Sequence, residues 1–279
     1  LTGGAVVTLT STGALTINPN GAYEDLGVGE TATESFTYTV SDGQGGSDTA
    51  TVDITITGVN DDPNAVNDSA ITDEETPTAG NVLTNDSDID GDALGVSEVG
   101  GSTLAVGTPV TGATGGAFTI AANGDWTYDP GTAHQDLALG QSATDWVQYT
   151  VSDGLGGSDT ALLSVTVTGV NDAPTAVDDG YTVAENATLS GLSLIANDTD
   201  PDSGDIPVVW AVNGATTIGS QITLASGALL VVNASGTFTY DPNGQFDALQ
   251  NGETATDSFT YTIQDGSGVQ DTATATITI

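Results

Sequence analysis

The sequence repeats itself at a fixed spacing, and this repetition limits the possible folds more than any other feature. The stretch Tyr38–Ala50 (YTVSDGQGGSDTA) returns almost unchanged as Tyr149–Ala161 and, in a looser form, as Tyr261–Ala273. The copies begin 111 and 112 residues apart. A period of this length predicts a tandem array of similar structural units.

The boundaries of the units follow from a second repeated motif. Gly58–Pro63 (GVNDDP) and Gly169–Pro174 (GVNDAP) each follow an alternating run of threonine and apolar residues, and we interpret both as links between domains. Residues 58–168 and 169–279 then form complete repeats, whereas residues 1–57 match only the second half of one. We expect residues before Leu1 to complete this half-repeat, because it would otherwise expose sheet edges; strands donated by another chain are the alternative.

Each repeat is predicted to be a series of short β-strands. Residues 35–40 and 49–56 alternate polar and apolar side chains, as half-buried strands do, and the SDGxGG sequence between them predicts a hairpin turn. No segment shows convincing helical periodicity. About seven or eight strands in roughly 110 residues are typical of an immunoglobulin-like sandwich. We therefore predict an all-β chain of tandem sandwich domains.

The charge of the chain excludes several classes of partner. It has 38 acidic residues, no lysine, no arginine and one histidine, so its formal net charge is -38. Nucleic acid and anionic membranes are excluded as partners because binding to either depends on basic residues. The carboxylates have no basic side chain to pair with, so metal ions, salt or separation must relieve their repulsion. The chain also lacks cysteine, so it cannot form disulfides.

Two dense acidic segments have the composition of calcium-binding loops. Asn85–Asp92 (NDSDIDGD) and Asn197–Asp205 (NDTDPDSGD) place carboxylates at nearly every second position, with glycine for a bend. Ca²⁺ takes six to eight oxygen ligands. The twelfth position counted from Asp86 is Ser97 rather than glutamate, and no helices flank the segment, so we reject an EF-hand. A solvated acidic turn is the alternative, but the absence of basic residues favours calcium.

Further acidic residues lie near each link, and oxygens from three segments would converge if the start of a domain and its acidic loop both face the link. The SDGxGG turn carrying Asp42 or Asp153 could close such a site from the preceding domain, or it could lie at the far pole. A metal held only by aligned domains would favour that alignment. The candidate metal ligands are Asn60, Asp61, Asp62, Asp68, Glu74, Asp86, Asp88, Asp90, Asp92, Asn171, Asp172, Asp179, Glu185, Asp198, Asp200, Asp202 and Asp205.

Together these motifs resemble the bacterial cadherin-like repeats of the VCBS type, which recur in giant RTX adhesins secreted by type I systems. The shared pattern is NDxP, AV(N/D)D, an early glutamate, NDxDxDGD, YDP and the GETATDSFTYTVSDGxGGSDTA run, and it covers all three units. The resemblance implies Ca²⁺-dependent immunoglobulin- or cadherin-like Greek-key β-sandwich domains in an elongated string. By motif position it points to Asp61, Asp172, Glu74, Glu185 and the two acidic loops as ligands.

The two complete repeats depart from each other within this pattern. Asp62 is replaced by Ala173, and Pro201 and Ser203 alter the second acidic loop. These departures leave open a difference in site occupancy or affinity between the repeats.

The sequence gives little support to catalysis. His134 is the sole histidine, and the matching positions hold Tyr23 and Phe246, so we interpret it as a substitute for a half-buried aromatic residue. A Ser-His-Asp arrangement would therefore exist in one repeat only. Paired carboxylates could hydrolyse glycosides, but these acids lie on turns that recur in every repeat. We predict no catalytic residues and no organic cofactor.

The three tryptophans raise the question of sugar binding. Trp126 aligns with Phe238 and is predicted to lie in the core, whereas Trp146 aligns with Ser35 and Ser258 and is predicted to point outward. For Trp210 the pattern VVWAV leaves both directions open. An exposed Trp146 is a candidate contact for a sugar.

We predict a non-catalytic stalk or extender of an extracellular or cell-surface bacterial adhesin, stiffened by several Ca²⁺ ions mainly near the links. Its partners would be neighbouring repeats of the same long chain and, through a tip outside this sequence, surface glycans. One alternative is a subunit of an extracellular filament or surface layer, in which identical chains form a fibre and a neighbouring chain completes the half-repeat. Another is a Ca²⁺-dependent carbohydrate-binding module.

Overall fold

The computed structural model describes residues 1–279 and is all-β, as the sequence predicts. It divides into two compact units. Unit 1 holds residues 1–72, 76–133 and 144–167, and unit 2 holds residues 73–75, 134–143 and 168–279. The division therefore passes through the second repeat, one end of which belongs to unit 2. We keep the names repeat 1, repeat 2 and repeat 3 for residues 1–57, 58–168 and 169–279.

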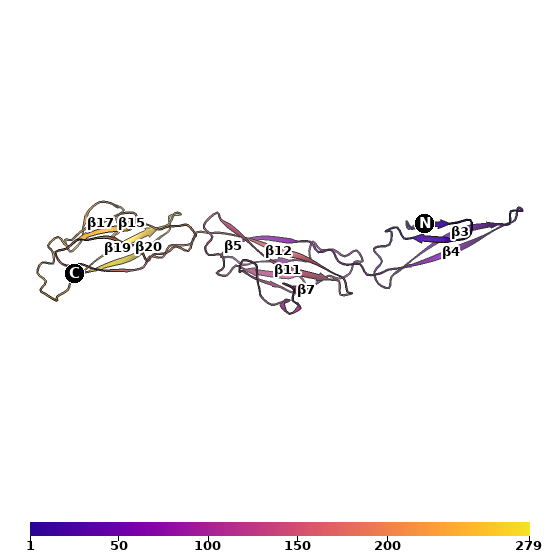
Figure 1. Cartoon of the computed structure of the whole chain (residues 1–279), viewed down its shortest axis with the longest axis horizontal. Helices are drawn as coiled ribbons and strands as arrows, with labels where there is room; N and C mark the ends of the chain where they lie inside the picture. Colours follow the sequence, from indigo (N-terminus) through magenta and orange to yellow (C-terminus); the bar gives the residue numbers. More distant parts are fainter. The chain divides into compact units, whose positions relative to one another are not determined.

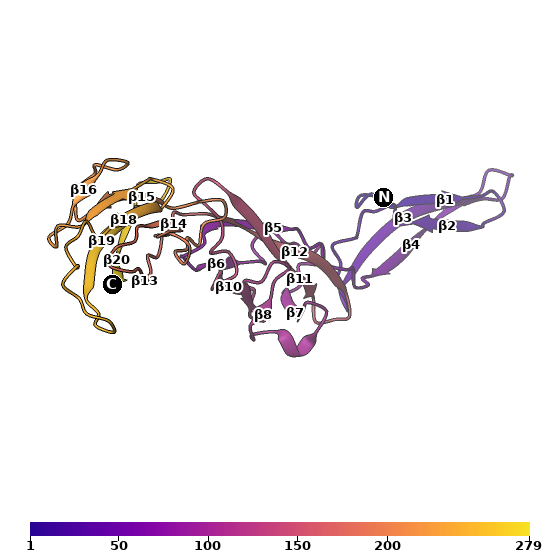
Figure 2. The ribbon, with the colours of Figure 1, turned by 60° about the vertical axis from the view of Figure 1, so that its left-hand side comes forward.

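Repeat 2 is a sandwich of two four-stranded sheets. One sheet has the order β5-β12-β11-β7 and the other β6-β10-β9-β8 (Figures 1 and 2). The elements are β5 (Asp68–Asp73), β6 (Thr78–Asn81), β7 (Gly95–Val99), the 3-10 turn η1 (Thr103–Ala105), β8 (Val110–Thr111), β9 (Ala117–Ile120), β10 (Asp125–Asp129), β11 (Ser142–Ser152) and β12 (Ser158–Thr168). Alternation along β11 buries Val147, Tyr149 and Val151 between the sheets.

Repeat 3 has the same architecture. Its sheets have the orders β13-β20-β19-β15 and β14-β18-β17-β16, and β13 pairs with β20 in parallel. The strands are β13 (Asp179–Thr182), β14 (Leu189–Ser193), β15 (Val208–Val212), β16 (Ile222–Thr223), β17 (Leu229–Val232), β18 (Thr237–Asp241), β19 (Thr256–Gln264) and β20 (Gln270–Thr278). Phe238, Tyr240, Phe259 and Tyr261 fill much of the core.

Repeat 1 contains only two strand pairs, β1-β2 and β3-β4. Their bounds are β1 (Val6–Leu9), β2 (Leu15–Asn18), β3 (Thr31–Ser41) and β4 (Ser47–Thr57). Side chains that would face a core are exposed or half-buried, and Leu9, Leu15, Phe36 and Tyr38 line a hollow of about 610 Å³. The counterparts of these residues in repeat 2 are buried, because there a second half of the sandwich covers them; repeat 1, with half of the strands, has an open apolar face.

A close approach of two backbones explains the glycine that begins each link. A Cβ at Gly58 would lie 2.0 Å from the carbonyl oxygen of Leu26, and one at Gly169 would lie 2.0 Å from that of Leu137. The Gly58 N–H also donates to the Glu30 carbonyl, as that of Gly169 does to Gln141. Each link therefore begins in close contact with the loop that leads into the long hairpin of the preceding repeat.

Candidate metal centres

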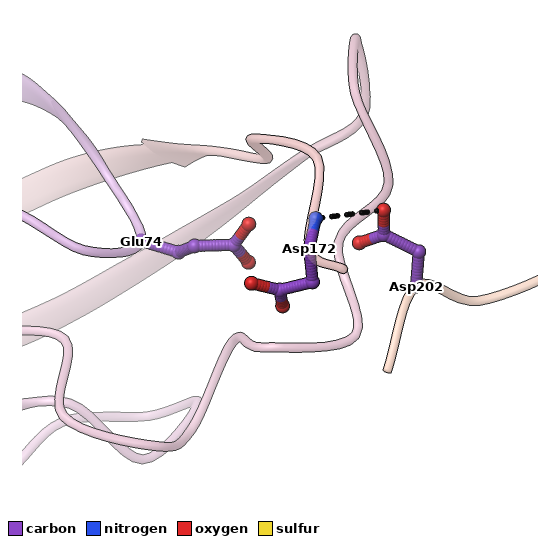
Figure 3. Close-up of side chains that lie close together, drawn as sticks. All are labelled: Glu74, Asp172 and Asp202. Atoms are coloured by element: carbon purple, nitrogen blue, oxygen red, sulfur yellow. Dashed lines mark hydrogen bonds between the residues drawn. The ribbon is translucent and has the colours of Figure 1, made fainter. Parts of the chain in front are cut away.

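Three carboxylates meet at the second link, inside unit 2. Glu74 follows β5, Asp172 belongs to the link and Asp202 lies in the loop between β14 and β15 (Figure 3). One carboxylate oxygen of each residue lies within 4.8 Å of a carboxylate oxygen of each of the other two. Glu74 is 1% exposed and Asp202 is 2% exposed. The fold thus brings three acidic side chains that are far apart in sequence into one largely buried group.

Hydrogen bonds satisfy only part of this group. Glu74 Oε1 accepts the Val170 N–H at 2.8 Å, and Asp202 Oδ2 accepts the Asp172 N–H at 3.1 Å. Glu74 Oε2, Asp172 Oδ2 and Asp202 Oδ1 are buried without a hydrogen-bond partner. A buried polar atom left in this way costs about 1–3 kcal/mol, and more when it is charged. The geometry therefore fits a cation among these oxygens.

The pKa values of the group respond to the same crowding. Burial raises the pKa of Glu74, and the negative charges of Asp172 and Asp202 raise it further. Burial likewise raises the pKa of Asp172 and of Asp202. A bound divalent cation would reverse this effect, because it stabilises the ionised form.

A second group of carboxylates shares Asp202. The oxygens of Asp200, Asp202 and Asp205 also lie within 4.8 Å of one another, and Asp200 Oδ2 is buried without a partner. The Asn171 side-chain N–H donates to Asp265 Oδ2 at 2.8 Å, which leaves the buried Asn171 Oδ1 without a partner as well. The oxygens come from several segments of unit 2, as a many-coordinate hard cation requires.

The first link, inside unit 1, has a smaller version of this arrangement. Asp88, Asp90 and Asp92 form one group, and Asp90 Oδ2 accepts the Asp61 N–H at 2.7 Å. One side-chain oxygen of each of these three residues is buried without a partner, as is Asn60 Oδ1. Burial raises the pKa of Asp92, with further contributions from the charges of Asp88 and Asp90.

The SDGxGG turn of repeat 2 lies at the first link, which begins that repeat. Of the two positions considered from the sequence, this is the far pole, at the end of the repeat away from the link that follows it. Asp153 Oδ2 accepts the Asn60 side-chain N–H at 2.7 Å, and its Oδ1 accepts backbone N–H groups of the turn. The hydrogen bond from Asn60 lowers the pKa of Asp153, although burial opposes it. Asp265 holds Asn171 in the same way. Neither aspartate was among the ligands predicted from the sequence; their signal was the strict repetition of the turn.

Glu74 does not lie at the link that precedes it in the sequence. It lies beyond the far end of β5 and bonds to Val170, at the link that follows its repeat. Glu185, its counterpart in repeat 3, is half-buried beside Leu249 and Ile279 at the corresponding end of that repeat. The acidic loop and the early glutamate of one repeat therefore belong to different links.

The remaining predicted ligands stand outside the three carboxylate groups. Asp68 accepts the Tyr149 hydroxyl at 2.7 Å, and Asp86 accepts the Val66 N–H at 2.7 Å. In repeat 3, Asp179 accepts the Tyr181 hydroxyl at 3.1 Å and Asp198 the Val177 N–H at 2.8 Å. Asp62 is exposed. Metal ligation by these residues stays a prediction.

Not every buried carboxylate lacks partners. Asp145 of β11 is fully buried and accepts the backbone N–H groups of Thr114, Gly116 and Trp146 and the Tyr128 hydroxyl. Its hydrogen-bonding capacity is met by the protein itself. Unpartnered oxygens are therefore not a general consequence of the acidic composition: they gather at the links and, near the start of repeats 2 and 3, on Asp86, Asp179 and Asp198.

Comparison with known families agrees with the sandwich repeats. The model of the bacterial cadherin-like domain matches residues 60–169 and 171–279. The chain belongs to the bacterial cadherin-like domain family. Residues 1–55 match a bacterial Ig domain. The resemblance found from the motifs is thus confirmed, and so is the all-β tandem sandwich fold.

Individual proteins similar to this cadherin-like chain include one lectin and, among solved structures, several cadherins. The calcium-binding lectin RapA2 of Rhizobium johnstonii is 32% identical over 175 residues, which are 57% of this chain and 73% of the lectin. Mouse cadherin-23 EC22-24 (15% identity, 97% of this chain, 81% of that one) and protocadherin gamma C5 EC1-3 (15%, 100% and 87%) share the fold, each with a TM-score of 0.52. The chain spans 64% of Drosophila N-cadherin EC1-4, with 97% of its own length covered, 18% identity and a TM-score of 0.38.

Two further observations bear on the class of protein. The matched families and relatives are described as cadherin-like and Ig domains, a lectin and cadherins, and none of them as an enzyme. No helix of the structure has the length and apolar character needed to cross a membrane.

Proposed function

We propose that this chain is a non-catalytic extender segment of a bacterial surface or secreted adhesin, in which Ca²⁺ bound at the links stiffens the connection between successive repeats. The observation that carries the proposal is the Glu74, Asp172 and Asp202 group, with its buried oxygens lacking hydrogen-bond partners. The cadherin-like family and the calcium-binding lectin relative support an extracellular, adhesion-related role.

The donor atoms favour calcium over other common metals. Every candidate ligand is a carboxylate or amide oxygen, the chain has no cysteine, and its single histidine is no member of the three carboxylate groups. Zinc and the later transition metals prefer nitrogen and sulfur ligands. Ca²⁺ accepts many oxygens in a flexible geometry, whereas Mg²⁺ demands a strict octahedron and retains water. Glu74, Asn171, Asp172, Asp200, Asp202 and Asp205 would hold the ion or ions at the second link.

Stiffening follows from where these ligands are attached. Glu74 belongs to repeat 2, Asp172 to the link and Asp202 to repeat 3, so a cation that contacts all three binds only when the segments are assembled. The free energy of cation binding is then added to the stability of the assembled link. Without the cation, the unpaired carboxylates repel one another and the link loosens.

The test is to remove calcium from the intact chain. We expect elemental analysis or anomalous scattering to find Ca²⁺ at both links. We also expect chelation with EGTA to lower the melting temperature and to broaden the range of conformations seen by small-angle scattering. A scattering profile and a melting temperature that are both unchanged by EGTA would refute the calcium-stiffened link.

The open apolar face of repeat 1 supports completion of that repeat by further strands. Such strands could come from the same polypeptide, as in a long stalk, or from a neighbouring molecule, as in a filament. The extender role requires only the first of these arrangements.

A further inference from the structure

The outward faces of the long hairpins carry no charge in the two complete repeats, although the chain has 38 acidic residues. Alternation along the strands directs apolar residues inward and leaves threonine, serine and glutamine outside. In repeat 2 the outward residues of β11 and β12 include Thr144, Trp146, Gln148, Thr150, Thr160, Leu162, Ser164 and Thr166. In repeat 3 those of β19 and β20 include Ser258, Thr260, Thr262, Gln264, Gln270, Thr272, Thr274 and Thr276. The long hairpin of each complete repeat thus has a neutral, hydroxyl-rich outward face. In repeat 2 the edge strand β7 adds one carboxylate beside it, because Glu98 pairs with Thr150.

A tryptophan interrupts this surface in repeat 2 without a structural need for it. Trp146 is 46% exposed, and its neighbours on the same face of β11, Thr144 and Gln148, are exposed too. The equivalent positions hold Ser35 in repeat 1 and Ser258 in repeat 3, where the same hairpin forms. Because the hairpin forms with serine at this position, the large aromatic side chain calls for another explanation.

Repeat 3 places a second tryptophan on the outer face of the equivalent sheet. Trp210 is 40% exposed and is the extra residue of a bulge in β15, between the paired Val209 and Ala211. The matching bulge in β7 of repeat 2 has Ser97 at this position. The exposed Val208, whose strand partner is Gln264, lies on the same face. Serine again suffices for the fold where the other repeat has tryptophan.

We propose that these two outer faces bind neutral polysaccharide, with Trp146 and Trp210 each stacking on the C–H face of a sugar ring. An indole is a rigid, flat apolar surface, and the hydroxyl and amide groups beside it can exchange hydrogen bonds with sugar hydroxyls. A neutral glycan is the fitting ligand because a chain of charge -38 repels anionic ones.

A second copy of the chain is a poorer occupant of the same surface. Two chains of this charge repel each other, and protein interfaces rely on an apolar centre that a threonine-rich face does not provide. The proposal also goes beyond calcium-stiffened links, because neither tryptophan belongs to a carboxylate group. Binding should therefore persist after the links have lost calcium, which separates this proposal from the extender role.

Affinity electrophoresis of the whole chain tests the proposal, using gels that contain dextran, galactomannan, xyloglucan or mixed-linkage β-glucan, with alginate as the anionic comparison. We expect at least one neutral polysaccharide to retard the chain, with and without EGTA, and alginate to leave it unretarded. Trp146→Ser should weaken the association by about tenfold, as the loss of one aromatic contact would. Trp210→Ser should also weaken it, and the double variant should not be retarded.

Both substitutions copy a residue that another repeat already uses, so the variants should fold; unchanged calcium-dependent melting verifies this. Leu104→Ser, which removes an 87% exposed apolar side chain elsewhere in repeat 2, is the matched control and should bind as the wild type does. No retardation by any neutral polysaccharide, or full retardation of the double variant, would overturn the proposal. Self-association that sedimentation detects only in the chain with both tryptophans, without polysaccharide binding, would assign the faces to a second copy instead.

Discussion

The two links begin with the same four residues, Gly-Val-Asn-Asp, yet they assemble different groups of acidic side chains. At the second link, Glu74 joins Asp172 and Asp202, and Asp202 also joins Asp200 and Asp205. The first link has a single group of three from its acidic loop. Residues 1–57 lack the half of a repeat that would carry a counterpart of Glu74. The carboxylate group at the second link is therefore drawn from consecutive repeats and is not a property of the link alone.

The acidic loops themselves add a second difference. The loop of repeat 3 is one residue longer, and its Ser203 N–H donates to the Asp136 carbonyl at 3.0 Å, which ties it to the end of repeat 2 within unit 2. In the shorter loop of repeat 2, the Gly91 N–H bonds within the loop to Asp88. The second link thus has a direct backbone contact in addition to its carboxylates, and should retain more order when calcium is removed.

The largest effect should come from Gly169→Ala, because the new Cβ would meet the Leu137 carbonyl oxygen at 2.0 Å. Displacing that backbone should destabilise the second link by on the order of 3 kcal/mol. Gly58→Ala should do the same at the first link. Thermal unfolding with and without calcium measures both variants. A small loss in either, or a loss that calcium fully restores, would show that the link can move aside.

Glu74→Gln tests the difference between the links directly. In calcium it should weaken binding at the second link by about tenfold or more, equivalent to roughly 1.4 kcal/mol, and leave the first link unchanged. In EGTA it should stabilise the chain, because it removes a buried charge that has like-charged neighbours. Calcium titration by calorimetry and melting curves measure the two effects.

A charge-matched control for Glu74→Gln is Asp53→Asn, on the outer face of β4, which should change neither calcium binding nor the stability gained in EGTA. If Glu74→Gln bound calcium as tightly as the wild type does, Glu74 would not be a ligand.

The double variant Asp88→Asn and Asp90→Asn addresses the other link. It should weaken calcium binding in repeat 2 while leaving the sites of repeat 3 largely intact, because the two acidic loops belong to separate groups. Calcium stoichiometry and the affinity of the remaining sites distinguish the outcomes. Equal losses at both links would mean that the sites are coupled and not separate.

The smallest effect concerns pH in the absence of calcium. Burial raises the pKa of Glu74 above its ordinary value of 4.5. The folded chain then binds the Glu74 proton more tightly than the unfolded chain does. The stability that this proton contributes to the folded state is present below about pH 4.5 and is lost as the pH rises through the raised pKa of Glu74. Glu74→Gln cannot ionise, and its advantage in melting temperature over the wild type should grow between about pH 4 and pH 7 in EGTA. An advantage that does not change with pH would contradict the raised pKa.

Much of the architecture could be predicted from the sequence because strands and hairpins are encoded locally. Alternation of side chains identified the long hairpins, and the position of Trp126, which is buried, and of Trp146, which is exposed, followed from comparing repeats. The acidic loops were evident from their composition. The roles of Asp153 and Asp265 were not predicted with the ligands, because a turn that satisfies its own backbone gives no local sign of what else its carboxylate contacts.

The sequence by itself determined the all-β repeats, the hairpins and the segments rich in carboxylates, since each depends on residues close together in the chain. Only the tertiary structure decided which of those segments meet. β5 runs from Asp68 to Asp73, and six residues of strand span about 20 Å, so Asp68 and Glu74 lie at opposite ends of their repeat. Glu74 is therefore carried to the link after its repeat, next to an acidic loop more than a hundred residues further along the chain. The period of the sequence predicts that such links recur, but the length of one strand decides which carboxylates form each site.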